Sequence, residues 1–100
     1  MTTDVDIDEK IKLDLKEPSD YNVIMINDDA TPMEWVMGVL KEIFKHSDAN
    51  AEALTMKIHT EDSAVVGTYK YEIAEQKGAE TILASRNHGF PLQISVEENE

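Results

Sequence analysis

Residues 21–40 of this 100-residue chain read YNVIMINDDATPMEWVMGVL, and this stretch decides the fold. It joins an expected strand, residues 21–26, to an expected helix through a polar turn at residues 27–31. A large apolar residue, Met33, follows within the first helical turn. Carboxylates between the end of a strand and the start of a helix are well placed to hold a small cationic group. We therefore expect a binding site here, and no catalysis.

The strand and the helix on either side of the turn each have a sequence signature. Both alternating sets of strand side chains are mostly apolar, so we expect both faces of this strand to be covered. Thr31 can cap the helix, Pro32 suits its first position and Glu34 completes a capping box. The apolar stripe consists of Met33, Val36, Met37, Leu40, Ile43 and Phe44, with Trp35 and Val39 off the stripe and an end near Lys45 and His46.

The rest of the chain predicts two further helices and two further strands. Ser47 or Asp48 caps a second helix that ends near His59, and a third helix covers residues 72–87. Strands are expected at residues 64–71, with a bulge or close approach at Gly67, and at residues 92–96. The order β-α-α-β-α-β predicts a compact α+β domain, in which three helices pack on one face of a three-stranded antiparallel sheet.

Composition divides the chain into an extension and one domain. Residues 1–20 are acidic and carry few large apolar side chains, which predicts a flexible N-terminal extension. Residues 21–97 form the expected domain, because 100 residues with 41% apolar content support one modest core.

Charge and motif content restrict the class of function. A formal charge of −12 argues against binding to nucleic acid or to an anionic membrane surface, although solubility alone would explain it equally well. The sequence contains no Cys and no apolar run of about 18 residues, and its first residues lead us to expect no secretory signal. Its His residues do not have the spacing of a metal site. We therefore expect a cytoplasmic monomer without a metal or cofactor.

A longer pattern resembles a known family. The chain contains Asn27-Asp28-Asp29-x-Thr31-Pro32-Met33-Glu34, then His59, Gly67, Glu72-Ile73-Ala74-Glu75-x-Lys77 and Pro91-Leu92. This pattern, which spans residues 21–96, resembles ClpS, the bacterial adaptor family that delivers N-degron substrates to the Clp AAA+ protease. The acidic segment at residues 1–20 resembles the family only in being a flexible N-terminal extension.

The resemblance implies a site for a free N-terminal residue with a large side chain, typically Leu, Phe, Tyr or Trp. It implies that Asn27, Asp28 and His59 hold the α-amino group. It implies a side-chain pocket lined by Asp29, Thr31, Met33, Val36, Thr55, Ile58 and Leu92. It also implies that a separate face with Glu72 and Lys77 binds the N-terminal domain of the unfoldase ClpA, or ClpC.

Each of these residues also has an ordinary structural interpretation. Taken alone, the Asn27-Asp28-Asp29 segment would be a turn and cap, and Met33 would be a core residue. A single His59 at a helix end would be a surface or capping residue, and Glu72 and Lys77 would be solvated. The complete pattern shifts these odds, most strongly for the turn, Met33 and His59.

The implied ligand suits the chemistry of the turn. An α-ammonium group carries three donors and needs acceptors that converge from different directions. Asn27 offers a carbonyl, Asp28 a carboxylate and neutral His59 one ring nitrogen, each worth roughly 1.5–3 kcal/mol when the bond is charge-assisted. Burial of a Leu or Phe side chain adds roughly 1.5–3 kcal/mol. After the cost of association, an affinity on the order of micromolar is expected.

Three residues carry sharper expectations. Many ClpS proteins have Met where this chain has Thr55, so we expect a wider and more polar pocket wall that favours Phe, Tyr or Trp over Leu. Met33, beside the turn, is expected to exclude the β-branched residues Ile and Val. Protonation of His59 would repel the ammonium group, so binding should weaken in mildly acidic solution.

Two other classes of protein remain as alternatives. A strand followed by paired Asp residues also opens phosphoacceptor receiver domains, but these need five alternating strands and helices. No nucleophile motif supports a hydrolase. A translation-factor-binding domain like that of the ribosomal stalk is the stronger rival, since the ClpS core resembles it. Such domains lack the motif at residues 27–34.

Overall fold

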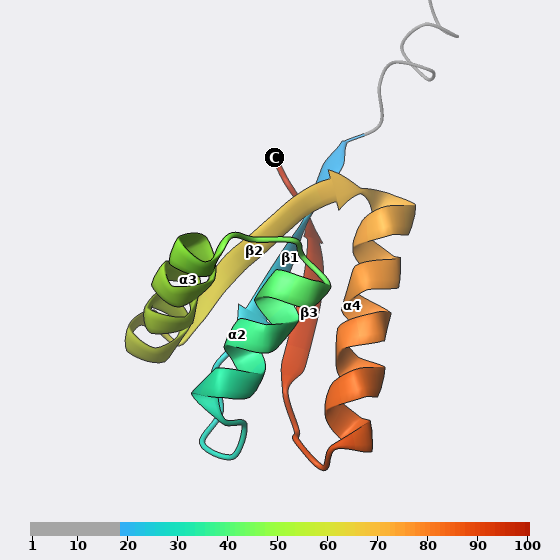
Figure 1. Cartoon of the computed structure of the whole chain (residues 1–100). Helices are drawn as coiled ribbons and strands as arrows, with labels where there is room; N and C mark the ends of the chain where they lie inside the picture. The colour runs from blue at the N-terminus through green and yellow to red at the C-terminus, as the bar shows by residue number, and fades with distance from the viewer. Residues whose placement is uncertain (1–18) are drawn as a thin grey trace, which may run out of the picture.

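The structure, a computed structural model, describes residues 19–100. Its elements in chain order are β1 (Asp20–Ile26), α2 (Met33–Glu42), α3 (Asp48–Glu61), β2 (Ser63–Lys70), α4 (Tyr71–Asn87) and β3 (Gln93–Glu98) (Figure 1). This order confirms the expected α+β fold. The predicted extension, residues 1–20, lies outside the described residues except for Ser19 and Asp20, and Asp20 already belongs to β1. At the other end, the Asn99 backbone N–H donates to the Asp20 carbonyl over 2.8 Å, so the ordered backbone extends past residue 97.

The three strands form one antiparallel sheet in the order β2-β1-β3. Val23 at the centre of β1 pairs with Gly67 on β2 and with Val96 on β3. The register on β2 then shifts, because the next residue of β1, Ile24, pairs with Val65. Val66 is therefore the extra residue of a β-bulge, which lies beside Gly67 as predicted.

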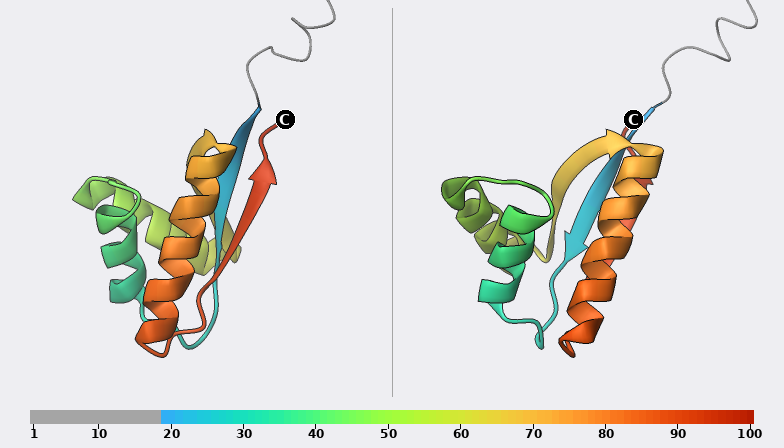
Figure 2. Two further views of the ribbon diagram at one scale, coloured as in Figure 1. Left: turned by 90° about the vertical axis from the view of Figure 1, so that its right-hand side faces the viewer. Right: turned by 45° about the vertical axis from the view of Figure 1, so that its right-hand side comes forward.

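All three helices lie on one face of this sheet (Figure 2). Val23 and Met25 point to that face and are fully buried. On the opposite face Ile24 is half-buried and its partner Val65 is exposed. The expectation that both faces of β1 are covered was therefore wrong for the part of the chain described. An antiparallel sheet can leave one face to solvent, because no crossover helix has to return over it.

The buried face of α2 differs from the predicted stripe. Val36, Val39 and Leu40 are buried, whereas Met33 is exposed. Val39 and Trp35 were both expected to lie off the stripe. Trp35 is half-buried, and its Nε1–H donates to Ser85 Oγ on α4 over 2.9 Å. Contacts from a neighbouring helix on this side widen the buried arc, which a single-helix periodicity does not reveal.

Helix α2 ends earlier than predicted because the chain turns left-handed just after it. Lys45 has φ 61°, and the His46 N–H donates back to the Leu40 carbonyl over 3.0 Å, which satisfies one of the carbonyls in the last turn of the helix. His46 Nε2 lies 2.6 Å from the carbonyl oxygen of the bulge residue Val66. A carbonyl can only accept, so this ring nitrogen donates and satisfies the Val66 carbonyl.

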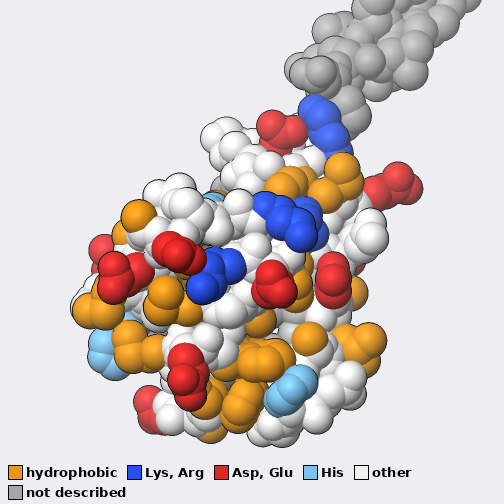
Figure 3. All heavy atoms as spheres, viewed as in Figure 1, with side chains coloured by type: hydrophobic (Ala, Val, Ile, Leu, Met, Phe, Trp, Pro, Cys, Tyr) orange, Lys and Arg blue, Asp and Glu red, His pale blue; other side chains and the backbone are white. Residues whose placement is uncertain are grey.

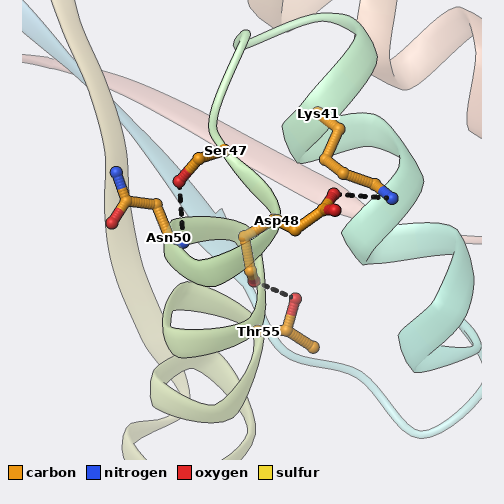
Figure 4. Close-up of polar contacts among 6 residues, drawn as sticks. Lys41, Ser47, Asp48, Asn50 and Thr55 are labelled. Carbon is orange, nitrogen blue, oxygen red and sulfur yellow. Dashed lines mark hydrogen bonds and ion pairs between the residues drawn. The ribbon is translucent and has the colours of Figure 1, made fainter.

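Helix α3 begins at Ser47, one of the two capping residues that the sequence predicted. Ser47 Oγ accepts from the Asn50 N–H over 3.2 Å, so Ser47 is the N-cap (Figure 4). Asp48, the other candidate, pairs with Lys41 of α2 at 3.3 Å. The first contact caps α3, and the second is an exposed ion pair that links the start of α3 to α2.

Helix α4 packs closely on the sheet at Gly78. A Cβ at this position would lie 3.3 Å from Ile94 Cγ2 and 3.5 Å from Val96 Cγ2 on β3. The glycine that weakens the isolated helix therefore permits close helix–sheet contact. Among residues 19–100, no helix is both long enough and apolar enough to span a bilayer.

Candidate functional site

A cavity of about 310 Å³ lies where the loop after β1 meets the start of α2 and the last turns of α3. Figure 1 shows this loop at the lower end of the molecule. Its lining, which we call the acidic cavity, consists of Asn27, Asp28, Asp29, Thr31, Pro32, Met33 and His59. Six of these seven residues were expected in the site, including all three proposed for the amino group. Pro32 was expected only as a helix-starting residue.

The carboxylate of Asp28 organises the turn. Its Oδ1 accepts from the backbone N–H groups of Ala30 and Thr31 over 2.8 Å and 2.7 Å, and its Oδ2 accepts from Thr31 Oγ1 over 2.8 Å. An Asp that bonds its own backbone two and three residues ahead holds a turn in one conformation. The loop that borders the cavity is thus held by one side chain.

This arrangement keeps Asp28 charged. Burial acts to raise the pKa of Asp28, but hydrogen bonds from the Thr31 side chain and from the Ala30 and Thr31 backbone, with the positive charge of Arg86, outweigh it. The pKa of this carboxyl therefore lies below its ordinary value of 3.8. The cavity carries a fixed negative charge at neutral pH.

The predicted capping box at the start of α2 is absent. The helix begins at Met33 with Pro32 as its N-cap, and no side chain caps it. Thr31, the expected cap, instead donates its hydroxyl to Asp28. This bond orients the Thr31 side chain toward the carboxylate, and hydrogen bonds to a charged acceptor are about twice as strong as neutral ones.

A backbone contact brings His59 to the turn. The Asn27 N–H donates to the carbonyl of Asp62 over 2.8 Å, which joins the end of β1 to the connection between α3 and β2. Asp62 caps α3 in the left-handed region with φ 73°. His59 lies three residues earlier, in the last turn of α3, and lines the acidic cavity together with Asn27 and Asp28.

The four other predicted pocket residues do not line the cavity. They are buried in the core cluster or beside it: Val36, Thr55, Ile58 and Leu92. They come from α2, α3 and the segment before β3, so the structure gathers them in the interior while the polar residues stay at the surface. The resemblance had implied that these four residues line the side-chain pocket together with Asp29, Thr31 and Met33, and that role stays a prediction.

Thr55 differs from expectation in one respect. Its hydroxyl donates to the Ala51 carbonyl one turn earlier in α3 over 2.7 Å (Figure 4). A hydroxyl already bonded within its own helix adds little polarity to a neighbouring wall. The expectation that Thr55 makes the pocket wall wider stays a prediction. The expectation that Thr55 makes this wall more polar is no longer supported, because its hydroxyl is already bonded.

Arg86 supports the site from α4 and was not foreseen as part of it. Its Nη1 donates to the carbonyls of Phe90 and Leu92 over 2.9 Å in both cases, which fixes the loop between α4 and β3. Its charge also lowers the pKa of Asp28. In the sequence Arg86 was visible only as a basic residue near a helix C-terminus.

The two residues expected to bind the unfoldase have different surroundings. Glu72 is exposed in the first turn of α4, between the exposed side chains of Tyr71 and Ile73. Lys77 Nζ donates to the Ile43 carbonyl over 2.8 Å and lies 5.4 Å from the centre of the Tyr69 ring. Lys77 therefore stabilises the C-terminal end of α2.

A second cavity, of about 220 Å³, lies between α2 and α4 and shares no residue with the acidic cavity. Its lining is largely apolar and consists of Trp35, Gly38, Val39, Glu42, Ile43 and Ala84. Figure 3 shows hydrophobic side chains gathered over these two helices. Within residues 19–100, no three His, Cys, Asp or Glu side chains are grouped to hold a metal ion.

Fold and site define a small α+β binding domain with an acidic cavity beside an apolar interior. Residues 16–95 match the family model of the ATP-dependent Clp protease adaptor protein ClpS. The chain therefore belongs to the ClpS family, which consists of adaptors and not of known enzymes. The ribosomal-stalk alternative is not needed.

Individual relatives agree with the family. The ClpS adapter protein of Treponema denticola is 46% identical over 82 residues, which cover 82% of this chain and 81% of that protein. The ClpS adapter protein of Caulobacter vibrioides is 39% identical over 90 residues, which cover 90% of this chain and 83% of that protein. The structure of Agrobacterium tumefaciens ClpS2 bound to L-phenylalaninamide matches with a TM-score of 0.80 and 37% identity, and covers 83% of this chain and all of that one.

Proposed function

We propose that this ClpS-family chain binds protein substrates through a free N-terminal Leu, Phe, Tyr or Trp and delivers them to the Clp unfoldase ClpA or ClpC. The observation that carries the proposal is the acidic cavity, in which acceptors from the β1 turn and from α3 face one space. The ligand of the A. tumefaciens relative, L-phenylalaninamide, supports it, since that molecule has a free α-amino group next to a benzyl side chain.

Recognition of the amino group would use Asn27, Asp28 and His59. A carboxylate has about four lone-pair sites. Asp28 already accepts three hydrogen bonds, two on Oδ1 and one on Oδ2, so a place on Oδ2 remains for an ammonium proton. The carbonyl of the Asn27 side chain and a neutral His59 nitrogen would accept the other two protons. An acetylated N-terminus has no charge and offers one proton, so it would be rejected.

Recognition of the side chain would start at Met33 and continue inward. Met33 is an apolar residue in the lining of the acidic cavity, whereas Val36, Ile58 and Leu92 are buried in the core. A cavity of about 310 Å³ is at the lower end of the range for small-ligand pockets, which suits one amino-acid residue. The apolar side chain would then contact the protein core through the space beside Met33.

Delivery to the unfoldase would use the surface at the start of α4. We expect the chain to act in the cytoplasm and as a monomer. Glu72 is exposed there, and the apolar side chains of Tyr71 and Ile73 on either side of it in the sequence are exposed as well, which suits contact with a protein partner. Lys77 would contribute indirectly, because its ammonium group is bonded to the Ile43 carbonyl.

Immobilised peptides that differ only at the N-terminus test the binding step. Peptides that begin with free Leu, Phe or Trp should retain the chain, while the same peptides after acetylation should not. Retention by both forms, or by neither, would overturn the proposal.

A pair of α4 variants tests the delivery step. Glu72→Lys should abolish binding to the ClpA or ClpC N-terminal domain and leave thermal stability unchanged. Lys77→Met should lower thermal stability, because the Ile43 carbonyl loses its partner. Normal binding of the unfoldase domain by Glu72→Lys would exclude this face.

A further inference from the structure

The lining of the acidic cavity is polar except on one side. Five of its seven residues carry polar or charged side chains, and the other two are Pro32 and Met33. Of these two, Met33 has the longer and more flexible side chain, and 43% of it is exposed. Met33 therefore supplies the one flexible apolar side chain in the lining of the cavity.

The methionines of the described region differ widely in access to solvent. Met25 is fully buried in the sheet and Met37 is half-buried on α2. Met33 and Met56 are 43% and 48% exposed. Met56 lies on α3 and does not line the cavity, so it is an internal comparison for Met33. Susceptibility of Met to oxidation follows exposure, so these two should react first.

We propose that Met33 is a site of reversible oxidation that weakens substrate binding, an inference that rests on the proposed function. A hydroperoxide transfers its terminal oxygen to the Met33 sulfur. The O–O bond breaks, an S=O bond forms, the sulfur loses two electrons, and the peroxide leaves as water or alcohol. Methionine sulfoxide reductases reverse the step, one enzyme for each sulfoxide epimer.

The consequence follows from the position of Met33. A sulfoxide is polar and accepts hydrogen bonds, so it would replace a flexible apolar side chain of the lining with another acceptor in the cavity that Asp28 and Asp29 also line. An entering Leu or Phe side chain would then leave water for a polar surface. We expect the affinity for such N-termini to fall at least tenfold.

The experiment oxidises the full chain with graded hydrogen peroxide and maps each Met by mass spectrometry. The affinity for a fluorescent peptide with a free N-terminal Phe is measured in parallel, before oxidation, after it, and after reduction by both reductases. Met33→Leu and the matched control Met56→Leu are treated in the same way. For each protein the readout is the ratio of its affinities before and after oxidation.

The expected result is a tenfold or larger loss in the wild type and in Met56→Leu, little loss in Met33→Leu, and recovery after reduction. An equal loss in Met33→Leu, unchanged affinity with Met33 fully oxidised, or slower oxidation of Met33 than of Met25 would each overturn the inference alone. Failure of the untreated wild type to bind the peptide would instead remove the proposed function, and this inference with it.

Discussion

Replacing Asp28 with Asn tests whether its carboxylate both stabilises the turn and binds the ammonium group of the ligand. The substitution keeps the shape of the side chain and an oxygen that can accept from the Ala30 and Thr31 N–H groups. It removes the negative charge and replaces Oδ2, which accepts from Thr31 Oγ1, with a donor. Both the loop and the ligand site should weaken.

The size of each effect follows from the contacts. Two charge-assisted bonds become neutral and a third must reverse its direction, so the free energy of unfolding should fall by about 1 kcal/mol. For a domain of this size, that lowers Tm by roughly 4–8 °C. Loss of one charge-assisted bond to the ammonium group should weaken peptide binding by about tenfold.

Asp29→Asn is the matched control, since it removes the same charge from the same cavity. Asp29 is exposed, so this variant should change the free energy of unfolding by less than about 0.5 kcal/mol. Both variants are compared with the wild type by thermal unfolding and by fluorescence anisotropy with a peptide that has a free N-terminal Phe.

Acid provides a further check on Asp28. Because its folded-state pKa is lowered, its charge contributes stability above pH 3.8, and this contribution is lost as the pH falls through the lower, folded-state pKa. The gap in stability between wild type and Asp28→Asn should therefore close in strong acid. Equal Tm values for the two proteins at pH 7, or equal losses in the two Asn variants, would refute the assigned role of Asp28.

Three further predictions concern other residues. Thr55→Met should narrow the pocket and raise the ratio of Leu to Trp affinity in titrations with matched peptides; an unchanged ratio would contradict a role for Thr55 in specificity. Lys45→Gly should stabilise the fold by about 1 kcal/mol in denaturant titrations, because Lys45 has φ 61° and a left-handed conformation disfavours side chains; a lower midpoint would show a compensating contact. At a fixed pH, peptide binding should weaken by about tenfold in His59→Phe, which removes the ring-nitrogen acceptor, and an unchanged affinity would exclude His59 as an acceptor.

Local sequence signals were sufficient for most of the fold. The order of elements, the Ser47 cap and the bulge beside Gly67 follow from residues close together in the chain. The polar part of the site was also predictable, because Asn27, Asp28 and Asp29 are adjacent and the ClpS resemblance added His59. The structure brings these four residues together in one cavity, and their role in binding stays a prediction.

What could not be predicted depends on competition between distant or alternative partners. Thr31 was assigned to cap α2, and only the geometry of the turn shows that the Asp28 carboxylate takes its hydroxyl. Val39 and Trp35 lie in the buried arc of α2 because other elements approach it. Lys77 was expected to be free for a partner, yet its ammonium group lies on the end of α2. Periodicity within one helix carries no information on such neighbours.

The central claim is that the acidic cavity binds a free N-terminal residue. The most direct measurement is a calorimetric titration of this chain with one peptide that begins with Phe, in free and N-acetylated forms. We predict a dissociation constant on the order of micromolar for the free form and at least roughly a hundredfold weaker binding for the acetylated form. Equal affinity for the two forms would contradict the claim.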